Sequence, residues 1–286
     1  MRGKTFRWQL PSRKLVLGGR TLVMGILNVT PDSFSDGGLF LDAEAAAKRA
    51  VEMEAAGADI IDVGGESTRP GSSGISSAEE LRRILPVLEG LRGKIQIPIS
   101  VDTSKSEVAE AAANAGAEIV NDVTGLRNDP RIGEVVRRRK LGLILMHMRG
   151  TPATMQRGPF ARDVIRDVTA GLRKSVEQAV RAGVSRAQIV IDPGIGFGKS
   201  HEQNCEIIRR LDQIAKLGFP LLVGTSRKSF LGTALKRSES DRMWGTAASV
   251  AGSILQGAHI VRVHDVPEMV QVARVADVIR NPKLLH

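Results

Sequence analysis

The chain has very few aromatic side chains. Phe and Trp together make up 3% of its 286 residues, and there is no tyrosine. Proteins that hold single-stranded nucleic acid stack the bases on aromatic rings, so this scarcity argues against nucleic acid as a partner. The formal net charge of +10 at pH 7 therefore indicates small anionic ligands instead.

Cysteine and long apolar runs are also scarce. The single cysteine, Cys205, excludes a disulfide within the chain and is typical of a reducing compartment. It lies in a predicted helix with no clear general base beside it, so we expect a packed thiol and not a nucleophile. No run approaches the roughly 20 apolar residues of a membrane-spanning helix, and the basic N-terminus lacks the apolar segment of a signal peptide. These absences predict a cytoplasmic protein that does not bind membranes.

Glycine, by contrast, is plentiful, and the stretch IDPGIGFGKS at residues 191–200 invites comparison with phosphate-binding loops. The P-loop pattern requires a glycine where this stretch has Pro193. The dinucleotide-binding pattern requires G-x-G-x-x-G, whereas this stretch has G-x-G-x-G. What remains is a short apolar strand that ends in a carboxylate, Asp192, followed by a glycine-rich turn.

Short apolar runs alternate with longer amphipathic stretches along the whole chain. Eight of these runs are typical of buried strands: 22–27, 59–63, 97–101, 118–120, 143–146, 189–191, 221–223 and 260–263. Eight strands, each followed by a helix, favour a (β/α)8 TIM barrel of the α/β class, with a doubly wound open sheet as the alternative. We predict a single domain over residues 1–286, with 1–20 as an N-terminal extension or hairpin and the barrel over about 21–281.

A polar or ionisable side chain ends or follows each predicted strand. In chain order these residues are Asn28, Asp62, Asp102, Asn121, His147, Asp192, Ser226, Arg262 and His264. A single acid at a strand end is explained equally well as the cap of the next helix. A full ring of polar groups at the carboxyl ends of barrel strands is where this fold builds active sites, so we predict a site there.

Several of these residues belong to longer motifs. GILNVTPDSFSDG at 25–37 and DVGGESTRPG at 62–71 resemble the signature segments of the dihydropteroate synthase family. So do VDTSK at 101–105, DPGIGFGK at 192–199, GTSRKSF at 224–230 and RVH at 262–264. The resemblance implies a transferase of folate biosynthesis, which joins a dihydropterin pyrophosphate to p-aminobenzoate and releases pyrophosphate.

The resemblance also implies roles for individual residues. Those expected at the pterin ring are Asp102, Asn121, Asp192, Lys228, Phe197, Gly224 and Met146. The edge of a pterin resembles a guanidinium, and carboxylates and amides accept the N–H groups of such an edge. The catalytic residues are expected to be Asp102, Asp192, Lys228 and Asn28. They would serve a dissociative (SN1-like) substitution whose developing positive charge the two carboxylates stabilise.

The leaving group and the second substrate are assigned in the same way. The residues expected to bind pyrophosphate are Asn28, Asp62, Arg262 and His264, and Asn28 is also expected to bind Mg²⁺, the implied cofactor. The residues expected to bind p-aminobenzoate are Phe34, Thr68, Arg69, Pro70, Ser226 and Lys228. Ser226 is expected at the start of the helix that follows the seventh strand, where free N–H groups favour an anion. A homodimer is a further implication of the resemblance.

Two other interpretations remain beside the synthase. A pterin-dependent methyltransferase holds its pterin in a similar barrel, but it needs neither the STRP sequence of the second loop nor the SRK motif. A catalytically silent pterin-binding paralogue with a regulatory role would be revealed by the loss of a motif residue, and every motif position is filled here.

Overall fold

A computed structural model of the protein describes residues 4–30, 38–67, 71–72, 74–156, 158–236 and 242–285. Over these residues the main sheet has eight strands, all parallel to their neighbours. They are β3 (Leu22–Asn28), β4 (Ile60–Gly64), β5 (Ile99–Asp102), β6 (Ile119–Asp122), β7 (Gly142–Met146), β8 (Ile189–Asp192), β9 (Leu222–Val223) and β10 (Ile260–Val263). Each coincides with a predicted strand to within two residues at either end.

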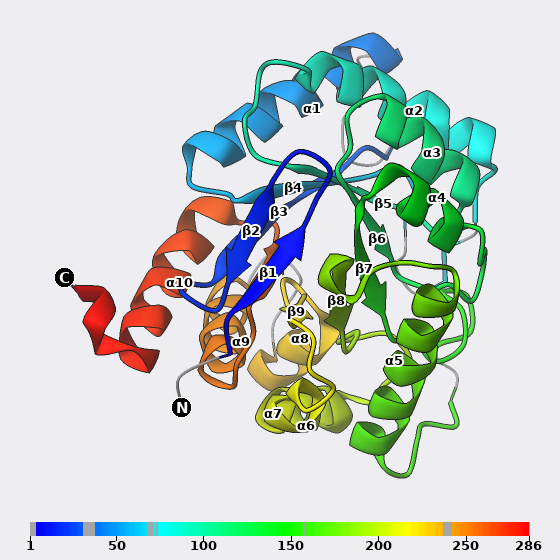
Figure 1. The fold of residues 1–286 in the computed structure, drawn as a ribbon. Coiled ribbons are helices and arrows are strands. Elements are labelled where there is room, and N and C mark those ends of the chain that lie inside the picture. Colours follow the sequence, from blue (N-terminus) through cyan, green and yellow to red (C-terminus); the bar gives the residue numbers. More distant parts are fainter. Residues whose placement is uncertain are drawn as a thin grey trace.

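The sheet curls into a barrel (Figure 1). Its spatial order is β8-β7-β6-β5-β4-β3-β10-β9, so the first strand of the barrel, β3, pairs with both β4 and the last strand, β10. Ile191 of β8 and Leu221, just before β9, form a parallel bridge, and the Ile191 N–H donates to the Pro220 carbonyl oxygen at 3.0 Å. This bridge joins the two ends of the sheet, and the predicted TIM barrel is confirmed.

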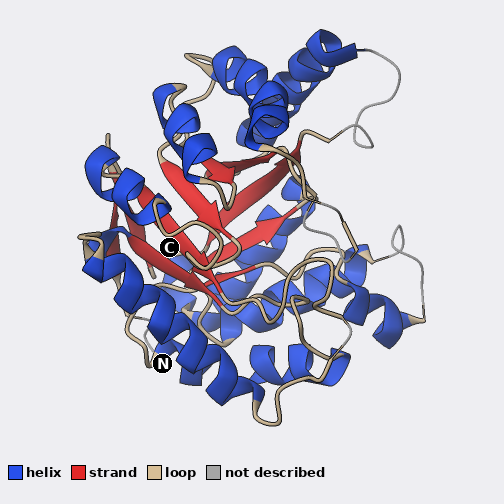
Figure 2. Cartoon of the chain, turned by 90° about the vertical axis from the view of Figure 1, so that its right-hand side faces the viewer, coloured by secondary structure: helices blue, strands red, loops and turns tan. Residues whose placement is uncertain are grey.

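Helices surround the sheet, as Figure 2 shows from the side. The α-helices are α1 (Gly38–Ala55), α2 (Ser77–Leu91), α3 (Ser106–Asn114), α4 (Ile132–Arg139), α5 (Val164–Arg181), α6 (His201–Arg209), α7 (Leu211–Ala215), α8 (Ser229–Leu235), α9 (Met243–Leu255) and α10 (Val266–Arg280). Two short 3-10 helices, η2 (Arg186–Gln188) and η3 (Pro282–Leu285), complete the set. Among the helices described, none is both long and apolar enough to cross a membrane. The main core lies between the outer face of the sheet and the apolar faces of these helices.

An antiparallel hairpin covers the amino-terminal end of the barrel (Figure 1). It consists of β1 (Phe6–Gln9) and β2 (Lys14–Leu17). The buried side chains of Trp8, Leu10 and Leu17 pack against barrel residues such as Met24 of β3 and Ile144 of β7, two strands that are not adjacent in the sheet. The Trp8 indole N–H donates to the Gln188 carbonyl oxygen at 2.7 Å, which fixes the hairpin in place. With this end filled by apolar side chains, a polar site has room only at the carboxyl ends of the strands.

Cys205 is not the packed thiol that the sequence predicts, because its side chain is exposed. The buried positions of α6 are Asn204 and Ile207. Since successive helical residues are turned by about 100° from one another, position 205 faces away from the core once its neighbour 204 faces inward.

Candidate active site

Arg262 of β10 joins carboxylates from two other strands. Its Nε donates to Asp62 Oδ2 at 2.6 Å, and its Nη2 donates to Asp102 Oδ2 at 2.8 Å. Asn121 Nδ2 donates to the same Asp62 oxygen at 3.0 Å. Asp62 is fully buried, and its Oδ1 has no hydrogen-bond partner in the part of the chain described here. The strand ends therefore bring four of the predicted residues into one network of charge-assisted hydrogen bonds.

Two carboxyl groups of this region, those of Asp102 and Asp192, have raised pKa values. Burial raises the pKa of Asp102 to about 7, although the neighbouring Arg262 guanidinium acts in the opposite direction. Burial also raises the pKa of Asp192 to about 6, opposed first by the Gly194 N–H, which donates to Asp192 Oδ1 at 2.7 Å. Two buried carboxyl groups that titrate close to pH 7 are suited to a ligand that brings its own N–H donors or positive charge.

Lys228 and Phe197 lie next to these acids. The Lys228 ammonium nitrogen is 4.1 Å from the centroid of the Phe197 ring, within the range of a cation–π contact. The pKa of Lys228 is lowered to about 8, first by burial and then by the Arg262 charge, while the charges of Asp192 and Asp102 act in the opposite direction. The predicted pterin residues Asp102, Asp192 and Lys228 and the predicted pyrophosphate residue Arg262 thus act on one another electrostatically.

An apolar wall adjoins the charged groups. Phe197 and Met146 form a buried cluster with Val123, Met148 and Met155, separate from the main core. Gly224, just after β9, lies beside Arg262, since a Cβ at this glycine would be 3.7 Å from the Arg262 Cβ. A flat ring would find both an apolar face and polar edge partners here, as small-molecule sites require.

His264 and Ser226 form a separate pair at the ends of β10 and β9. The Ser226 hydroxyl and His264 Nδ1 are 2.9 Å apart, and the His264 main-chain N–H donates to the same hydroxyl at 3.2 Å. Burial, followed by the Arg262 charge, lowers the pKa of His264 to about 3, so the imidazole is neutral at pH 7. The expectation that Ser226 begins the next helix is wrong, because α8 starts at Ser229.

Asn28 ends β3 close to Asp102. A Cβ placed on Gly64, between them, would be 3.9 Å from both Asn28 Oδ1 and Asp102 Oδ2. Over the described residues there is no group of three or more His, Cys, Asp or Glu side chains that could hold a metal ion. One neutral amide oxygen fits an ion that takes most of its ligands from phosphate and water, as Mg²⁺ does. Magnesium at Asn28 stays a prediction.

Four of the residues predicted to bind p-aminobenzoate, Phe34, Thr68, Arg69 and Pro70, lie outside the described residues. The segment before Thr68 is described, and it contains an ionic cluster that the sequence did not reveal. Lys105, after β5, donates to the carboxylates of Glu66 and Glu80. Glu80 is fully buried in α2, and burial raises its pKa, opposed by the bond from Lys105. The cluster fixes the start of the second signature loop.

A parallel barrel with a cluster of buried acids and nearby cations at the carboxyl ends of its strands is the architecture of a barrel enzyme that binds a small polar ring. Comparison with known proteins gives the family. A sequence model described as "Pterin binding enzyme" matches residues 24–264, and the chain belongs to that family.

Several proteins similar to this chain are dihydropteroate synthases. A dihydropteroate synthase of Synechocystis is 49% identical over 263 residues, which cover 92% of this chain and 91% of the relative. A dihydropteroate synthase structure from Clostridium difficile, solved in the presence of pteroic acid, has a TM-score of 0.87 and 46% identity and covers 92% of this chain and 98% of that one. One from Xanthomonas albilineans, with 4-aminobenzoic acid, has a TM-score of 0.90 and 39% identity and covers 97% and 99%.

Proposed function

We propose that this protein is a dihydropteroate synthase. It condenses 6-hydroxymethyl-7,8-dihydropterin pyrophosphate with p-aminobenzoate to give 7,8-dihydropteroate and pyrophosphate. The observation that carries the proposal is the set of three buried residues, Asp102, Asn121 and Asp192, together with the half-buried Lys228, at the mouth of the barrel. Relatives of nearly the same length bear that name. Neither a silent paralogue nor a methyltransferase is favoured by these relatives.

Asp192 and Asp102 bind the pterin and stabilise the charge that develops in the reaction. One oxygen of Asp192 accepts from Gly194, which leaves the other for the N–H groups of the pterin edge. When the C–O bond to pyrophosphate breaks, positive charge spreads from the methylene carbon into the pterin. Ionised carboxylates in a buried pocket stabilise that charge without having to reorganise. No covalent intermediate with the protein is required.

Arg262 and His264 receive the leaving group beside Asn28. Nε and Nη2 of Arg262 donate to Asp62 and Asp102. The N–H groups not used in these two bonds, including those of Nη1, would donate to the phosphate oxygens. His264 is neutral and acts as a hydrogen-bond partner, not as a cation. Asn28 would hold Mg²⁺, which neutralises charge on the pyrophosphate when bound. Ser226 and Lys228, with Phe34 and residues 68–70, would bind p-aminobenzoate.

The test is an assay of pyrophosphate release by the purified protein. Release is expected only with both substrates and Mg²⁺ present, and removing Mg²⁺ with a chelator should abolish it. Asp192→Asn should lower kcat/KM by an amount equivalent to about 1.5–3 kcal/mol, the usual cost of a lost charge-assisted hydrogen bond. Release that needs only one substrate would contradict the proposal, and an Asp192→Asn variant with unchanged kinetics would remove that carboxylate from the site.

We also propose that the protein forms a homodimer through the outer face of α9 and α10. Large apolar side chains are exposed there, with Trp244 82%, Val275 61% and Ile279 64% accessible. The groove between these helices is lined by Ala247, Ala248, Ala251, Leu255, Gln271, Val272, Val275, Ala276 and Ile279, with no charged side chain in this lining. Contiguous apolar surface of this kind marks interaction sites, and a twofold axis would bury two copies of it together.

Light scattering of the purified protein tests the dimer. Wild type is expected to have twice the mass of one chain, and Ile279→Glu to have the mass of a single chain at the same concentration. Val180→Glu is the matched control, because Val180 is an exposed apolar residue of α5, away from this face. A monomeric wild type, or an Ile279→Glu variant that remains dimeric, would refute this interface.

A further inference from the structure

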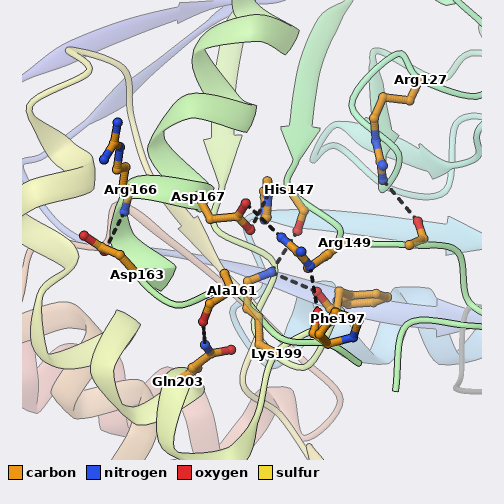
Figure 3. A network of polar contacts seen from close by, with 12 residues as sticks. Arg127, His147, Arg149, Ala161, Asp163, Arg166, Asp167, Phe197, Lys199 and Gln203 are labelled. Carbon is orange, nitrogen blue, oxygen red and sulfur yellow. Dashed lines mark hydrogen bonds and ion pairs between the residues drawn. The ribbon is translucent and has the colours of Figure 1, made fainter. Parts of the chain in front are cut away.

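A buried lysine joins two loops of the barrel mouth. Lys199 follows β8, at the end of the glycine-rich motif, and only 2% of its surface is exposed. Its ammonium group donates to the carbonyl oxygen of Phe197 at 2.9 Å and to that of His147, after β7, at 3.2 Å (Figure 3). Both acceptors are neutral main-chain groups, so the lysine is not held by a salt bridge at these two contacts.

The two loops meet main chain to main chain, which explains why such a donor is needed. A Cβ at Gly194 would be 2.0 Å from the His147 carbonyl oxygen, and one at Gly198 would be 2.3 Å from that of Arg149. Both glycines have positive φ, 68° and 70°. Contact this close buries the carbonyl groups away from solvent, and buried carbonyl groups require hydrogen-bond donors. Lys199 supplies donors to one carbonyl group on each loop.

The residues held in this way line the pterin pocket. Phe197 packs with Met146 and Met148 in the apolar wall, and its ring lies under the Lys228 ammonium nitrogen at 4.1 Å. A Cβ at Gly196 would be 3.1 Å from Lys228 Cδ, so the same loop also contacts the stem of that lysine. The main chain at Phe197 therefore determines where both the ring and Lys228 lie.

We propose that Lys199 is a positioning residue for the pterin pocket, which ties the loop after β7 to the loop after β8 and so fixes Phe197, Lys228 and Asp192. It acts through these residues and not by contact with the substrate. This inference rests on the proposed synthase function, because it concerns how that site is held in shape.

The charge of Lys199 has a second effect, on Asp192. The ammonium lowers the pKa of that carboxyl group, which burial raises to about 6. The charged groups that face Lys199 are Asp192 of β8, Asp167 of α5, Lys228 after β9 and Arg127 after β6. Asp167 is itself paired with Arg149 at 3.1 Å and lies 3.6 Å from His147 Nε2 (Figure 3). Removing the ammonium should therefore leave Asp192 harder to ionise.

Two substitutions separate the hydrogen bonds from the charge. Lys199→Met keeps the unbranched stem and loses both, whereas Lys199→Gln loses the charge and keeps an N–H donor, on a side chain one atom shorter. We expect Lys199→Met to raise the KM for the pterin pyrophosphate by about tenfold or more, as displaced binding groups do, with the KM for p-aminobenzoate changed far less. Lys199→Gln should restore part of the pterin KM. In both variants the acidic limb of the pH profile of kcat/KM should move to higher pH, because the pKa of Asp192 rises when the ammonium is lost.

Lys174→Met is the matched control, because Lys174 is exposed on α5, and its kinetics should equal those of wild type. A double-mutant cycle of Lys199→Met with Phe197→Leu should be strongly non-additive if the lysine acts through Phe197. Equal KM values and an unmoved acidic limb in folded Lys199→Met would overturn the inference, as would additive effects in the cycle. If Lys199→Met does not fold, the pterin KM and the acidic limb of Lys199→Gln decide the matter together, and wild-type values of both would overturn the inference. An inactive wild type would instead count against the synthase function.

Discussion

Lys105 and Lys199 both lie at the carboxyl end of the barrel, but their ammonium groups have different hydrogen-bond acceptors. Lys105 donates to two carboxylates, Glu66 and Glu80. Lys199 donates to two neutral carbonyl oxygens. Burial acts to lower the pKa of both lysines. At Lys105 the carboxylates outweigh burial and the pKa is raised, whereas at Lys199 burial prevails and the pKa falls to about 7.

The difference shows that the two lysines stabilise the site in different ways. At Lys105 three charges offset one another, so each depends on the others for its stability in the interior. At Lys199 the ammonium supplies hydrogen-bond donors to buried carbonyl groups. Burying its charge costs desolvation free energy, which the nearby carboxylates of Asp192 and Asp167 offset only in part. The first arrangement should be sensitive to the loss of a partner, and the second to the protonation state of the lysine itself.

The largest effect is expected from Lys105→Met. Removing this cation leaves the fully buried Glu80 without its partner, and breaking a buried ion pair in this way costs about 3–5 kcal/mol in the free energy of unfolding. Urea denaturation measures it. Lys105→Met combined with Glu80→Gln should recover much of the loss, because no buried charge remains unpaired at position 80. A single variant as stable as wild type would show that the pair does not act as described.

A somewhat smaller effect is expected from pH. The pKa of Lys199 is about 7 in the folded protein and 10.5 ordinarily, so between these values only the unfolded chain carries the proton. Folded protein then gains stability as pH rises, by up to about 1.4 kcal/mol per pH unit. The difference in unfolding free energy between wild type and Lys199→Met should grow by about 2–3 kcal/mol from pH 7.5 to 9.5.

Lys105 supplies the control for this pH dependence. Its pKa is raised above 10.5, so folded and unfolded chains are both protonated throughout this window. The difference between wild type and Lys105→Met should therefore stay constant from pH 7.5 to 9.5, and fall only at higher pH as the folded lysine titrates. Parallel curves for the two lysines would contradict the contrast between them.

Much of this architecture follows from local sequence signals. The eight strands are short apolar runs bounded by turns, and each is confirmed in the barrel. The hairpin before β3 was also expected, although nothing in the sequence shows that Trp8 and Leu10 would fill the barrel end, because their partners come from distant strands. The meeting of Asp62, Asn121 and Arg262 follows from the barrel topology, since carboxyl ends of parallel strands converge.

The two lysines were missed for different reasons. Lys105 pairs with Glu80, a residue of α2 that is 25 positions away in the sequence. A helical glutamate is usually solvated, so the sequence gives no sign that this carboxylate is fully buried. Lys199 bonds to main-chain oxygens, which carry no side-chain signature at all. The available signal was the glycines of its motif, since close approach of two main chains buries carbonyl groups that need donors. The start of α8 was misjudged because the turn from Thr225 to Lys228 delays the helix.

The smallest effect at either buried lysine is expected from Lys199→Met at pH 7, where only the free energy of unfolding is measured. Two buried carbonyl groups lose a donor, but the desolvation of an ammonium is lost with it, so the free energy of unfolding should fall by only about 1–2 kcal/mol. Lys174→Met, at an exposed position of α5, should change it by less than about 0.5 kcal/mol. The order Lys105→Met, Lys199→Met, Lys174→Met in urea is the sharpest test of the comparison. A loss at Lys199 as large as that at Lys105 would mean that it too depends on a carboxylate partner, and the two lysines would then belong to one kind of site.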